Sequence, residues 1–485
     1  MIFNTVSYLV FLCAAVGVYW ALPPRHRVWF LLGASIVFYG LWRPEFVLLI
    51  GFSAWVDFYF SLRIHAAGSP ARRRLFLVCS LATNLALLLY FKYAYFVAEN
   101  FEGLSALLGH PVRIELGKIV LPLGISFYTF LSVSYTVDVY RRVFEPVRSF
   151  PLYLTYVMFW PHMIAGPILR AKELLPQLSA SHPARAQDFA YGIRYVLLGL
   201  FLKCVLADNI SPQVDAAFRT PAAMLGGADV LTMAFAFGYQ IYFDFAGYSM
   251  IAIGSARLLG IRFPENFDWP YLATSPREFW KRWHITLSSW IRDYLYLPLC
   301  GSRFRDRSEG GLEVATPEDR SHPVRIYVAL FLTWFLMGLW HGASWRFAFW
   351  GLWHATFIAA YRLFSRLSLP MPDRVRRVAG WGVTLIVVML GWIPFRAPDM
   401  ATSIELLSRV LDPRGYFRLS FRENFYLIAF AILVGMLLLR WATTRETSRR
   451  RAPWFALADV AGMAVVMFLV FIFLRPISQF IYFQF

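Results

Sequence analysis

Apolar segments recur along the whole chain, and each can span or nearly span a hydrocarbon core about 30 Å thick. We predict about twelve such segments in the 485-residue sequence. Their approximate ranges are 6–22, 28–42, 46–62, 75–97, 118–138, 188–207, 229–256, 325–341, 346–363, 379–396, 424–441 and 457–475. No long hydrophilic block separates them, so residues 1–485 are predicted to form a single all-α integral membrane domain. Its most informative motifs lie in 118–363, and an aromatic tail occupies 476–485.

The charge content supports the same class. Only 16% of the residues are charged, whereas a soluble domain carries about a quarter, which excludes an ordinary water-soluble enzyme. The net charge of +18 is spread over short loops between apolar segments. That distribution is typical of the flanks of membrane helices and does not predict a nucleic-acid partner.

Arginine-rich loops predict the orientation, because such loops favour the cytoplasm. Placing the loops around Arg25 and around 72–74 inside puts the N-terminus outside. The alternation continues to the end of the chain and puts Phe485 outside as well. Two apolar stretches, 151–167 and 279–299, break this alternation because polar residues and prolines interrupt them. We predict that both are re-entrant or interfacial.

Asp244 and Tyr248 place polar groups in the otherwise apolar segment 240–249. An ionisable group at membrane depth is a functional candidate. Alternatively, Asp244 pairs with an arginine and locks two helices together. Both interpretations stay open at this point.

A helix is predicted to begin at Ser275, with Ser275 as N-cap, Pro276 in the first turn and Glu278 completing a capping box. Within this helix Arg277, Lys281, His284 and Ser288 follow the spacing of one face, and Arg282 lies beside them. Such cations suit a phosphate-bearing donor. The alternative is a solvated basic patch with a structural histidine.

His341 ends an apolar stretch that begins near Val328, and Gly342 permits a backbone break directly after it. A neutral imidazole at that depth can take a proton from a hydroxyl. The alternative is a core histidine bonded to a carbonyl. His354 lies thirteen residues further, and no metal site is predicted because no ligand spacing surrounds either histidine.

Several ordered motifs resemble the membrane-bound O-acyltransferase family, and within it the alginate O-acetyltransferase branch. They are Pro122 to Phe130, Phe159 to Pro167 with His162, Tyr242 to Ser249, Phe279 to Ser288, Arg292-Asp293-Tyr294, Trp340-His341-Gly342 and the terminal Phe480 to Phe485. The resemblance implies a ring of about 11–13 transmembrane helices, with re-entrant segments, around a central tunnel. It further implies that His341 is the catalytic histidine and His284 its partner, with His354 a further histidine of that branch.

The resemblance also implies a reaction. Acetyl-CoA would serve as a cytoplasmic donor substrate, with no permanently bound cofactor. The acetyl group would cross the bacterial inner membrane to an exported polysaccharide, alginate or similar, within a synthesis and export complex. A periplasmic partner of the SGNH-hydrolase-like type would complete the transfer, and Tyr482 in the aromatic tail is either an acyl relay or a membrane anchor.

Three other functions stay open. The chain could be a D-alanyl-exporting relative from teichoic acid synthesis. It could be a transporter that uses Asp244 and His341 as a relay. It could also be a scaffold for an exopolysaccharide synthase, in which the histidines are structural.

Overall fold

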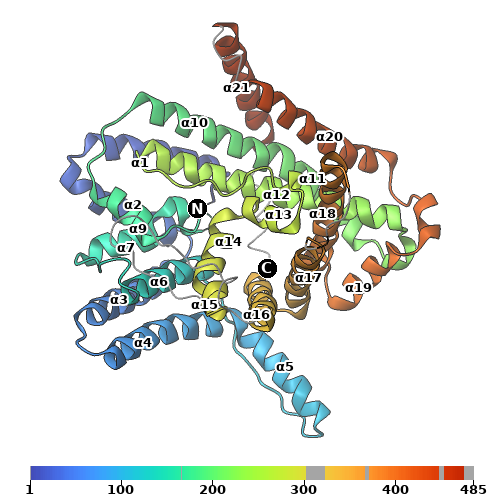
Figure 1. The fold of residues 1–485 in the computed structure, drawn as a ribbon. Helices are drawn as coiled ribbons and strands as arrows, with labels where there is room; N and C mark the ends of the chain where they lie inside the picture. Colours follow the sequence, from blue (N-terminus) through green and yellow to red (C-terminus); the bar gives the residue numbers. More distant parts are fainter. Residues whose placement is uncertain are drawn as a thin grey trace.

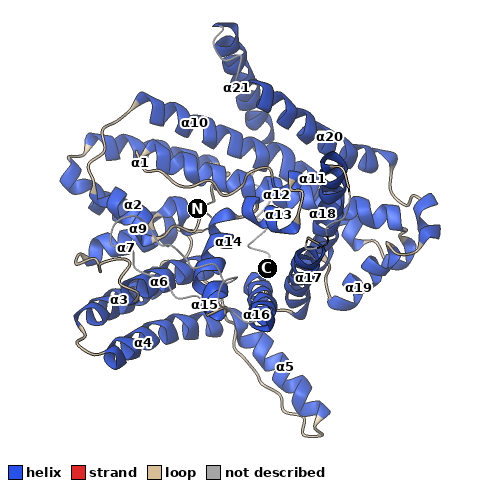
Figure 2. Cartoon of the chain, viewed as in Figure 1, coloured by secondary structure: helices blue, strands red, loops and turns tan. Residues whose placement is uncertain are grey.

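The computed structural model describes residues 2–164, 166–301, 323–365, 367, 371–446 and 453–474. Across these ranges the regular elements are all helical, and Figure 2 shows helices joined by loops without strands. The prediction of an all-α membrane protein is therefore confirmed.

Most long helices coincide with the predicted apolar segments. The first half of the chain contains α1 (Val6–Ala21), α2 (Pro24–Gly40), α3 (Glu45–Ala66), α4 (Pro70–Leu88), η1 (Leu89–Tyr93), α5 (Ala94–Leu107), α6 (Ile125–Tyr140), α7 (Phe150–Met158), α8 (Trp160–Met163), α9 (Ala171–Ser179), α10 (Ala186–Leu200), η2 (Phe201–Ala207), α11 (Asp208–Arg219) and η3 (Ala222–Met224). The second half contains α12 (Gly227–Leu258), η4 (Pro270–Leu272), α13 (Pro276–Arg282), α14 (Ile285–Ile291), η5 (Arg292–Tyr296), α15 (Leu297–Leu299), α16 (Pro323–His341), α17 (Trp345–Phe364), α18 (Asp373–Arg396), α19 (Met400–Arg409), η7 (Pro413–Phe417), α20 (Glu423–Glu446) and α21 (Pro453–Phe473).

Six helical stretches of the described residues are long and apolar enough to cross a membrane. They are Glu45–Ala66, Pro70–Leu107, Ala186–Arg219, Pro323–His341, Asp373–Arg396 and Glu423–Ala442, and two shorter apolar helices cover Val6–Ala21 and Asp459–Phe473. This is fewer than the roughly twelve spans predicted from apolar length. The difference arises because the interior helix α12 carries polar residues, and because α1, α2 and α6 are only 16, 17 and 16 residues long.

The 32-residue helix α12 is the interior element of the fold, and most of its side chains are buried. It packs against α10, η2, α11 and α18, and Figure 1 shows α10 running beside it. Small residues permit the closest approach: a Cβ added to Gly247 would lie 2.7 Å from the carbonyl oxygen of Gly199. Glycines at such crossings let membrane helices pack backbone to backbone.

Both segments that were predicted to be re-entrant are broken helices. The stretch 151–167 contains α7 and, after Phe159, the single turn α8, while 279–299 is divided among α13, α14, η5 and α15. Irregular backbone at membrane depth requires surrounding protein, and both segments are largely buried. The interruption predicted from their polar residues is therefore confirmed.

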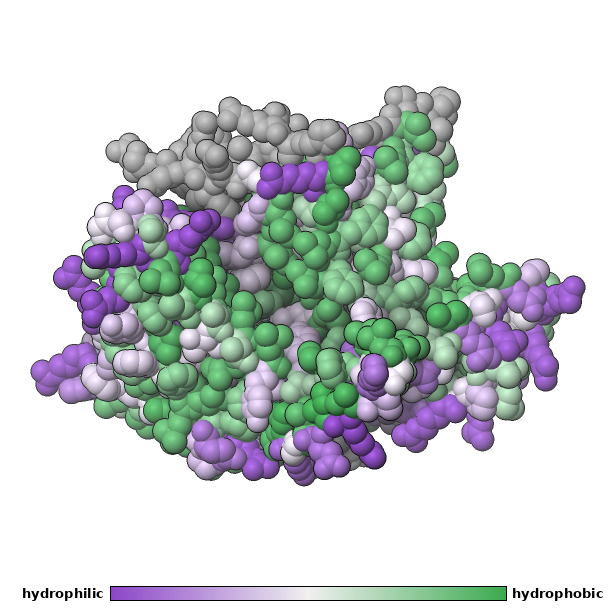
Figure 3. Space-filling view, turned by 90° about the horizontal axis from the view of Figure 1, so that it is seen from below, coloured by the Kyte–Doolittle hydropathy of each residue, from purple (hydrophilic) through white to green (hydrophobic). Residues whose placement is uncertain are grey.

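The surface of the molecule suits a bilayer. Large apolar side chains are exposed along α1, α4, α5, α20 and α21, and Figure 3 shows hydrophobic residues over much of one face with hydrophilic residues toward its rim. Lipid tails are the solvent for such a surface, so the chain is a multi-pass membrane protein.

Candidate active site

The hairpin of α16 and α17 carries two of the predicted histidines. The two helices pack closely, and a Cβ on Gly351 would lie 2.0 Å from the carbonyl oxygen of Trp334. His341 is the last residue of α16, and His354 lies in the middle of α17. Their exposed fractions are 6% and 1%, so the hairpin buries both imidazoles on its inner side.

Aromatic rings surround these two imidazoles. The centroid of Trp350 lies 4.9 Å from His341 and 4.9 Å from His354. Phe395 of α18 contacts His341 at 5.3 Å, and Trp280 of α13 contacts His354 at 5.0 Å. Figure 1 shows α16, α17 and α18 next to one another. The rings exclude water from both imidazoles, which strengthens electrostatic interactions there.

The prediction that Arg277, Lys281, His284 and Ser288 share one helix face is wrong. Helix α13 ends at Arg282, and His284 has a left-handed backbone with φ 42° before α14 begins at Ile285. The cause is a distant loop. The amide of Asp268 donates to the carbonyl of Arg282, and the amide of Ile285 donates to the carbonyl of Asn266, both at 2.9 Å. These bonds divert backbone groups that a continuous helix would pair internally.

Asn266 orients the His284 side chain. Its Oδ1 accepts from the Thr286 amide at 3.3 Å and lies 3.1 Å from His284 Nδ1. A backbone N–H can only donate, so the atom of Asn266 that faces the Thr286 amide is its oxygen. The same oxygen accepts from His284, and the proton of His284 is therefore on Nδ1. The buried Nε2 then presents a lone pair, and it has no hydrogen-bond partner among the described residues. Sequence reasoning missed Asn266, since a polar loop residue carries no periodic signal.

The three histidines lie near one another. His284 and His354 are both close enough to His341 for their charges to act on it, and so is Lys92. In the described part of the chain, no group of three or more His, Cys, Asp or Glu side chains is arranged to hold a metal ion. The arrangement suits proton transfer by imidazole.

A cavity of about 360 Å³ lies between the broken segment and α16, and we call it the basic cavity. Three of the residues predicted for a donor site, Arg277, Lys281 and Ser288, line this cavity, and Arg292 joins them. Arg282 does not line this cavity. Its guanidinium instead donates to Glu278 at 2.7 Å, because the i, i+4 spacing puts these two residues on another face of α13.

The start of α13 is as predicted, but the capping box is not. Ser275 Oγ accepts from the Glu278 amide at 3.2 Å, which confirms the N-cap. The Glu278 carboxylate accepts from the amide and the hydroxyl of Thr274, both at 2.7 Å, in place of the Ser275 amide. Burial acts to raise the pKa of Glu278, but the bonds from Thr274 and Arg282 outweigh it and lower that pKa.

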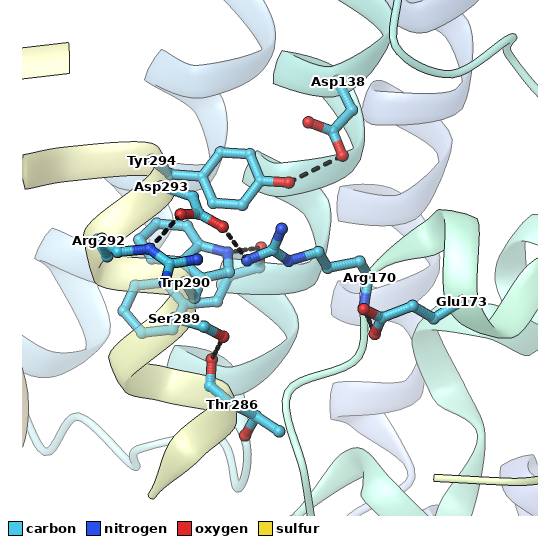
Figure 4. Close-up of polar contacts among 10 residues, drawn as sticks. Asp138, Arg170, Glu173, Thr286, Ser289, Trp290, Arg292, Asp293 and Tyr294 are labelled. Atoms are coloured by element: carbon cyan, nitrogen blue, oxygen red, sulfur yellow. Dashed lines mark hydrogen bonds and ion pairs between the residues drawn. The ribbon is translucent and has the colours of Figure 1, made fainter. Parts of the chain in front are cut away.

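Asp293 forms ion pairs with two arginines beside the basic cavity. Figure 4 shows its carboxylate between Arg292 and Arg170, with 2.7 Å to Arg292 Nε and a close ion pair to Arg170. In the same cluster the Tyr294 hydroxyl donates to Asp138 at 2.8 Å. Asp293 therefore orients Arg292, which lines the cavity. Arg170 was not foreseen, because it lies more than a hundred residues away in sequence.

The remaining predicted polar residues make structural contacts. Asp244 pairs with Lys203 at 2.5 Å, so the ion pair seen among the described residues contains a lysine in place of the predicted arginine. The ring of Tyr248 stacks on Phe3 with centroids 4.6 Å apart. His162 Nε2 lies 3.0 Å from the carbonyl oxygen of Tyr156. The first two contacts join α12 to η2 and to the N-terminal segment, and the third joins α8 to α7 within the broken helix.

A second cavity of about 140 Å³, here called the histidine cavity, is lined by Lys92, by residues 121–127 and by His341. Met337 lines the basic cavity, and His341 lies one turn further along α16. The two cavities therefore meet α16 at successive turns near its C-terminal end.

Comparison with known proteins decides the family. A family model described as MBOAT, membrane-bound O-acyltransferase family, matches residues 147–311. The chain is 38% identical over 406 residues to the probable alginate O-acetylase AlgI of Azotobacter vinelandii, covering 82% of this chain and 76% of the relative. The chain belongs to the membrane-bound O-acyltransferase family. It is therefore an O-acyltransferase of the membrane, and the resemblance read from its motifs is confirmed.

Two further relatives show how broad that family is. The probable alginate O-acetylase AlgI of Pseudomonas aeruginosa is 37% identical, over 82% of this chain and 73% of the relative. The peptidoglycan O-acetyltransferase of Helicobacter pylori is 31% identical, over 81% of this chain and 75% of the relative. The family match covers the segment with Asn266, His284 and Asp293. Tyr482, predicted as relay or anchor, lies outside the described residues.

Proposed function

We propose that this O-acyltransferase moves an acetyl group from cytoplasmic acetyl-CoA to an exported polysaccharide, alginate or a similar glycan. The observation that carries the proposal is the pair of cavities that reach α16 one turn apart. One is rich in cations and the other contains His341. The names of the relatives, which act on alginate or peptidoglycan, support a glycan as the final acceptor.

Arginine, lysine and hydroxyl groups make the basic cavity suitable for the donor. Arg277, Lys281 and Arg292 can bind the phosphates of coenzyme A by charge-assisted hydrogen bonds. The arginine-rich loops favour the cytoplasm, and the resulting alternation puts the start of α16 inside and His341 toward the outside. A donor in the basic cavity would then approach from the cytoplasm, and the acceptor would approach through the histidine cavity.

His341 is proposed as the general base. The acceptor hydroxyl attacks the thioester carbonyl carbon, and the His341 imidazole takes the hydroxyl proton as the new C–O bond forms. When the C–S bond breaks, the thiolate leaves and receives that proton from the imidazolium. His284 is its proposed partner, because Asn266 accepts from its Nδ1 and so leaves the lone pair on Nε2. The aromatic surround excludes water that would hydrolyse the thioester.

The same proposal includes a periplasmic SGNH-hydrolase-like partner, within a polysaccharide synthesis and export complex of the bacterial inner membrane. Both termini would face the periplasm. Tyr482 would then be a transient acyl acceptor or a docking residue of the tail. Tyr482→Phe keeps the ring and removes the hydroxyl, so loss of acetylation with intact donor binding is expected for a relay. Wild-type acetylation in this variant would leave only anchoring.

The deciding experiment measures acyl transfer by the purified protein in nanodiscs. Thiol release from acetyl-CoA, with an alcohol as acceptor, should be abolished in His341→Ala while expression, insertion and donor binding are retained. His182→Ala is the matched control. His182 lies in a loop, and the one hydrogen bond described for its ring is to the carbonyl oxygen of Gln177. Turnover in well-folded His341→Ala would refute the role of His341.

The alternatives give different results in the same assay. A D-alanyl-transferring enzyme would cleave a D-alanyl thioester and leave acetyl-CoA intact. A transporter or a scaffold would cleave neither.

A further inference from the structure

Lys92 is an ionisable residue inside the continuous helical stretch Pro70–Leu107. Ionisable residues in membrane-spanning segments are rare and usually functional. Sequence reasoning assigned nothing to Lys92, which lies nearly 250 residues before His341. Its side chain is part-buried and lines the histidine cavity together with His341.

Every contact of the Lys92 ammonium that the structure gives is with the end of α16. Nζ donates to the carbonyl oxygen of Trp340 in a close hydrogen bond and to that of His341 at 3.4 Å. It also lies 5.6 Å from the centroid of the Trp340 ring. In the part of the chain that the structure describes, no carboxylate pairs with it. The negative end of the α16 dipole and an aromatic face therefore stabilise this charge.

The neighbouring residue acts on the same helix end. The Tyr93 hydroxyl donates to the carbonyl oxygen of Leu339 at 3.0 Å. Lys92 and Tyr93 both belong to η1, a π-helical turn between α4 and α5. A π-helical turn accommodates one extra residue in a helix and is often found at functional sites. Here consecutive residues of η1 reach the carbonyls of three consecutive residues, 339, 340 and 341.

These carbonyls are the ones that a helix cannot pair internally. The last four C=O groups of an α-helix lack partners within it, and basic side chains can satisfy them from outside. The backbone turns away directly after His341, where Gly342 is packed so tightly that a Cβ would lie 2.1 Å from the Phe347 ring. Lys92 and Tyr93 thus supply donors to three of the four carbonyl groups at the end of α16.

We infer that η1 is a clamp that positions His341, with Lys92 and Tyr93 holding the last turn of α16 and Lys92 adding positive charge to the histidine cavity. This inference rests on the proposed role of His341 in acyl transfer. A positive charge beside the reaction centre favours the oxyanion that forms when the hydroxyl attacks the thioester. Lys92 is thus a positioning residue on the acceptor side of the reaction.

The clamp is tested by substitution of its two members. Lys92→Met keeps the length and removes both hydrogen bonds and the charge, Lys92→Arg keeps the charge, and Tyr93→Phe removes one hydroxyl. Lys118→Met is the matched control, because Lys118 is exposed in the loop before α6. We expect kcat to fall about tenfold or more in Lys92→Met, the change that about 1.4 kcal/mol produces. Tyr93→Phe should lose less, Lys92→Arg should recover part of the rate, and the donor KM should stay unchanged.

A second readout does not depend on activity. Hydrogen exchange measured by mass spectrometry should accelerate in peptides that cover 336–345 in Lys92→Met, while α12 and the Lys118→Met control stay as in the wild type. Unchanged exchange in these peptides would overturn the clamp. Faster exchange with wild-type kcat would overturn its role in catalysis. If the wild type itself transfers no acyl group, the proposed function fails, and the exchange experiment still decides whether η1 holds α16.

Discussion

Replacing Asn266 with alanine should reduce turnover although this residue is not expected to contact substrate. Its side chain accepts from the Thr286 hydroxyl at 2.9 Å, from the Thr286 amide at 3.3 Å and from His284 Nδ1 at 3.1 Å. Its Nδ2 donates to Ser249 at 3.1 Å. Asn266→Ala removes all four contacts and leaves the imidazole free to turn or to move its proton to Nε2.

The size of the effect follows from these contacts. A buried donor left without its acceptor costs about 1–3 kcal/mol. If this cost for His284 adds to the activation free energy of acyl transfer, the rate drops about 5- to 150-fold, because 1.36 kcal/mol corresponds to about tenfold. The donor KM should change little, since Asn266 does not line the basic cavity. Thermal stability should fall as well, because Thr286 also loses its partner.

The assay is acetyl-CoA turnover by purified variants in nanodiscs, with thermal unfolding followed on the same samples. Asn209→Ala is the matched control. Asn209 is exposed, and its amide bonds only to carbonyls of its own helical segment among the contacts described. Its turnover should match that of the wild type.

A double-mutant cycle separates the action through His284 from a general loss of structure. If Asn266 acts by orienting that imidazole, Asn266→Ala should cost almost nothing in a His284→Ala background. Additive losses would refute the orienting role. So would wild-type turnover in Asn266→Ala alone.

Two further predictions concern the donor cavity and the helix hairpin. Arg277→Ala and Lys281→Ala should each raise the donor KM about tenfold, because a hydrogen bond to a charged group contributes about 1.5–3 kcal/mol. Arg282→Ala should leave the donor KM unchanged. Equal effects of the three substitutions on the donor KM would contradict the cavity assignment. Gly351→Ala should destabilise the protein by about 1–3 kcal/mol or more, since overpacking forces α16 and α17 apart. Gly382 has open space around its Cβ position, so in a thermal unfolding experiment Gly382→Ala should unfold at the same temperature as the wild type.

Much of the fold could be predicted from sequence because the bilayer imposes a simple rule. An apolar run must be long enough to cross it, and its backbone must be paired internally. The segment 346–363 was predicted, and α17 covers Trp345–Phe364. The break after His341 was also predictable, because Gly342 and the end of the apolar run are local signals. The family motifs likewise lie within short stretches of sequence.

Contacts between distant segments decided the rest. The helix predicted from Ser275 onward stops at Arg282 because a loop at 266–268 pairs with its backbone, and no local pattern encodes that loop's position. Spacing therefore assigned His284 to the face of Arg277 and Lys281, whereas the fold turns it toward Asn266. Lys92 reaches the end of α16 only because the helices are packed together. Sequence determined where the apolar segments lie, since apolar length is a local property, and tertiary packing decided which polar groups meet inside the helical bundle.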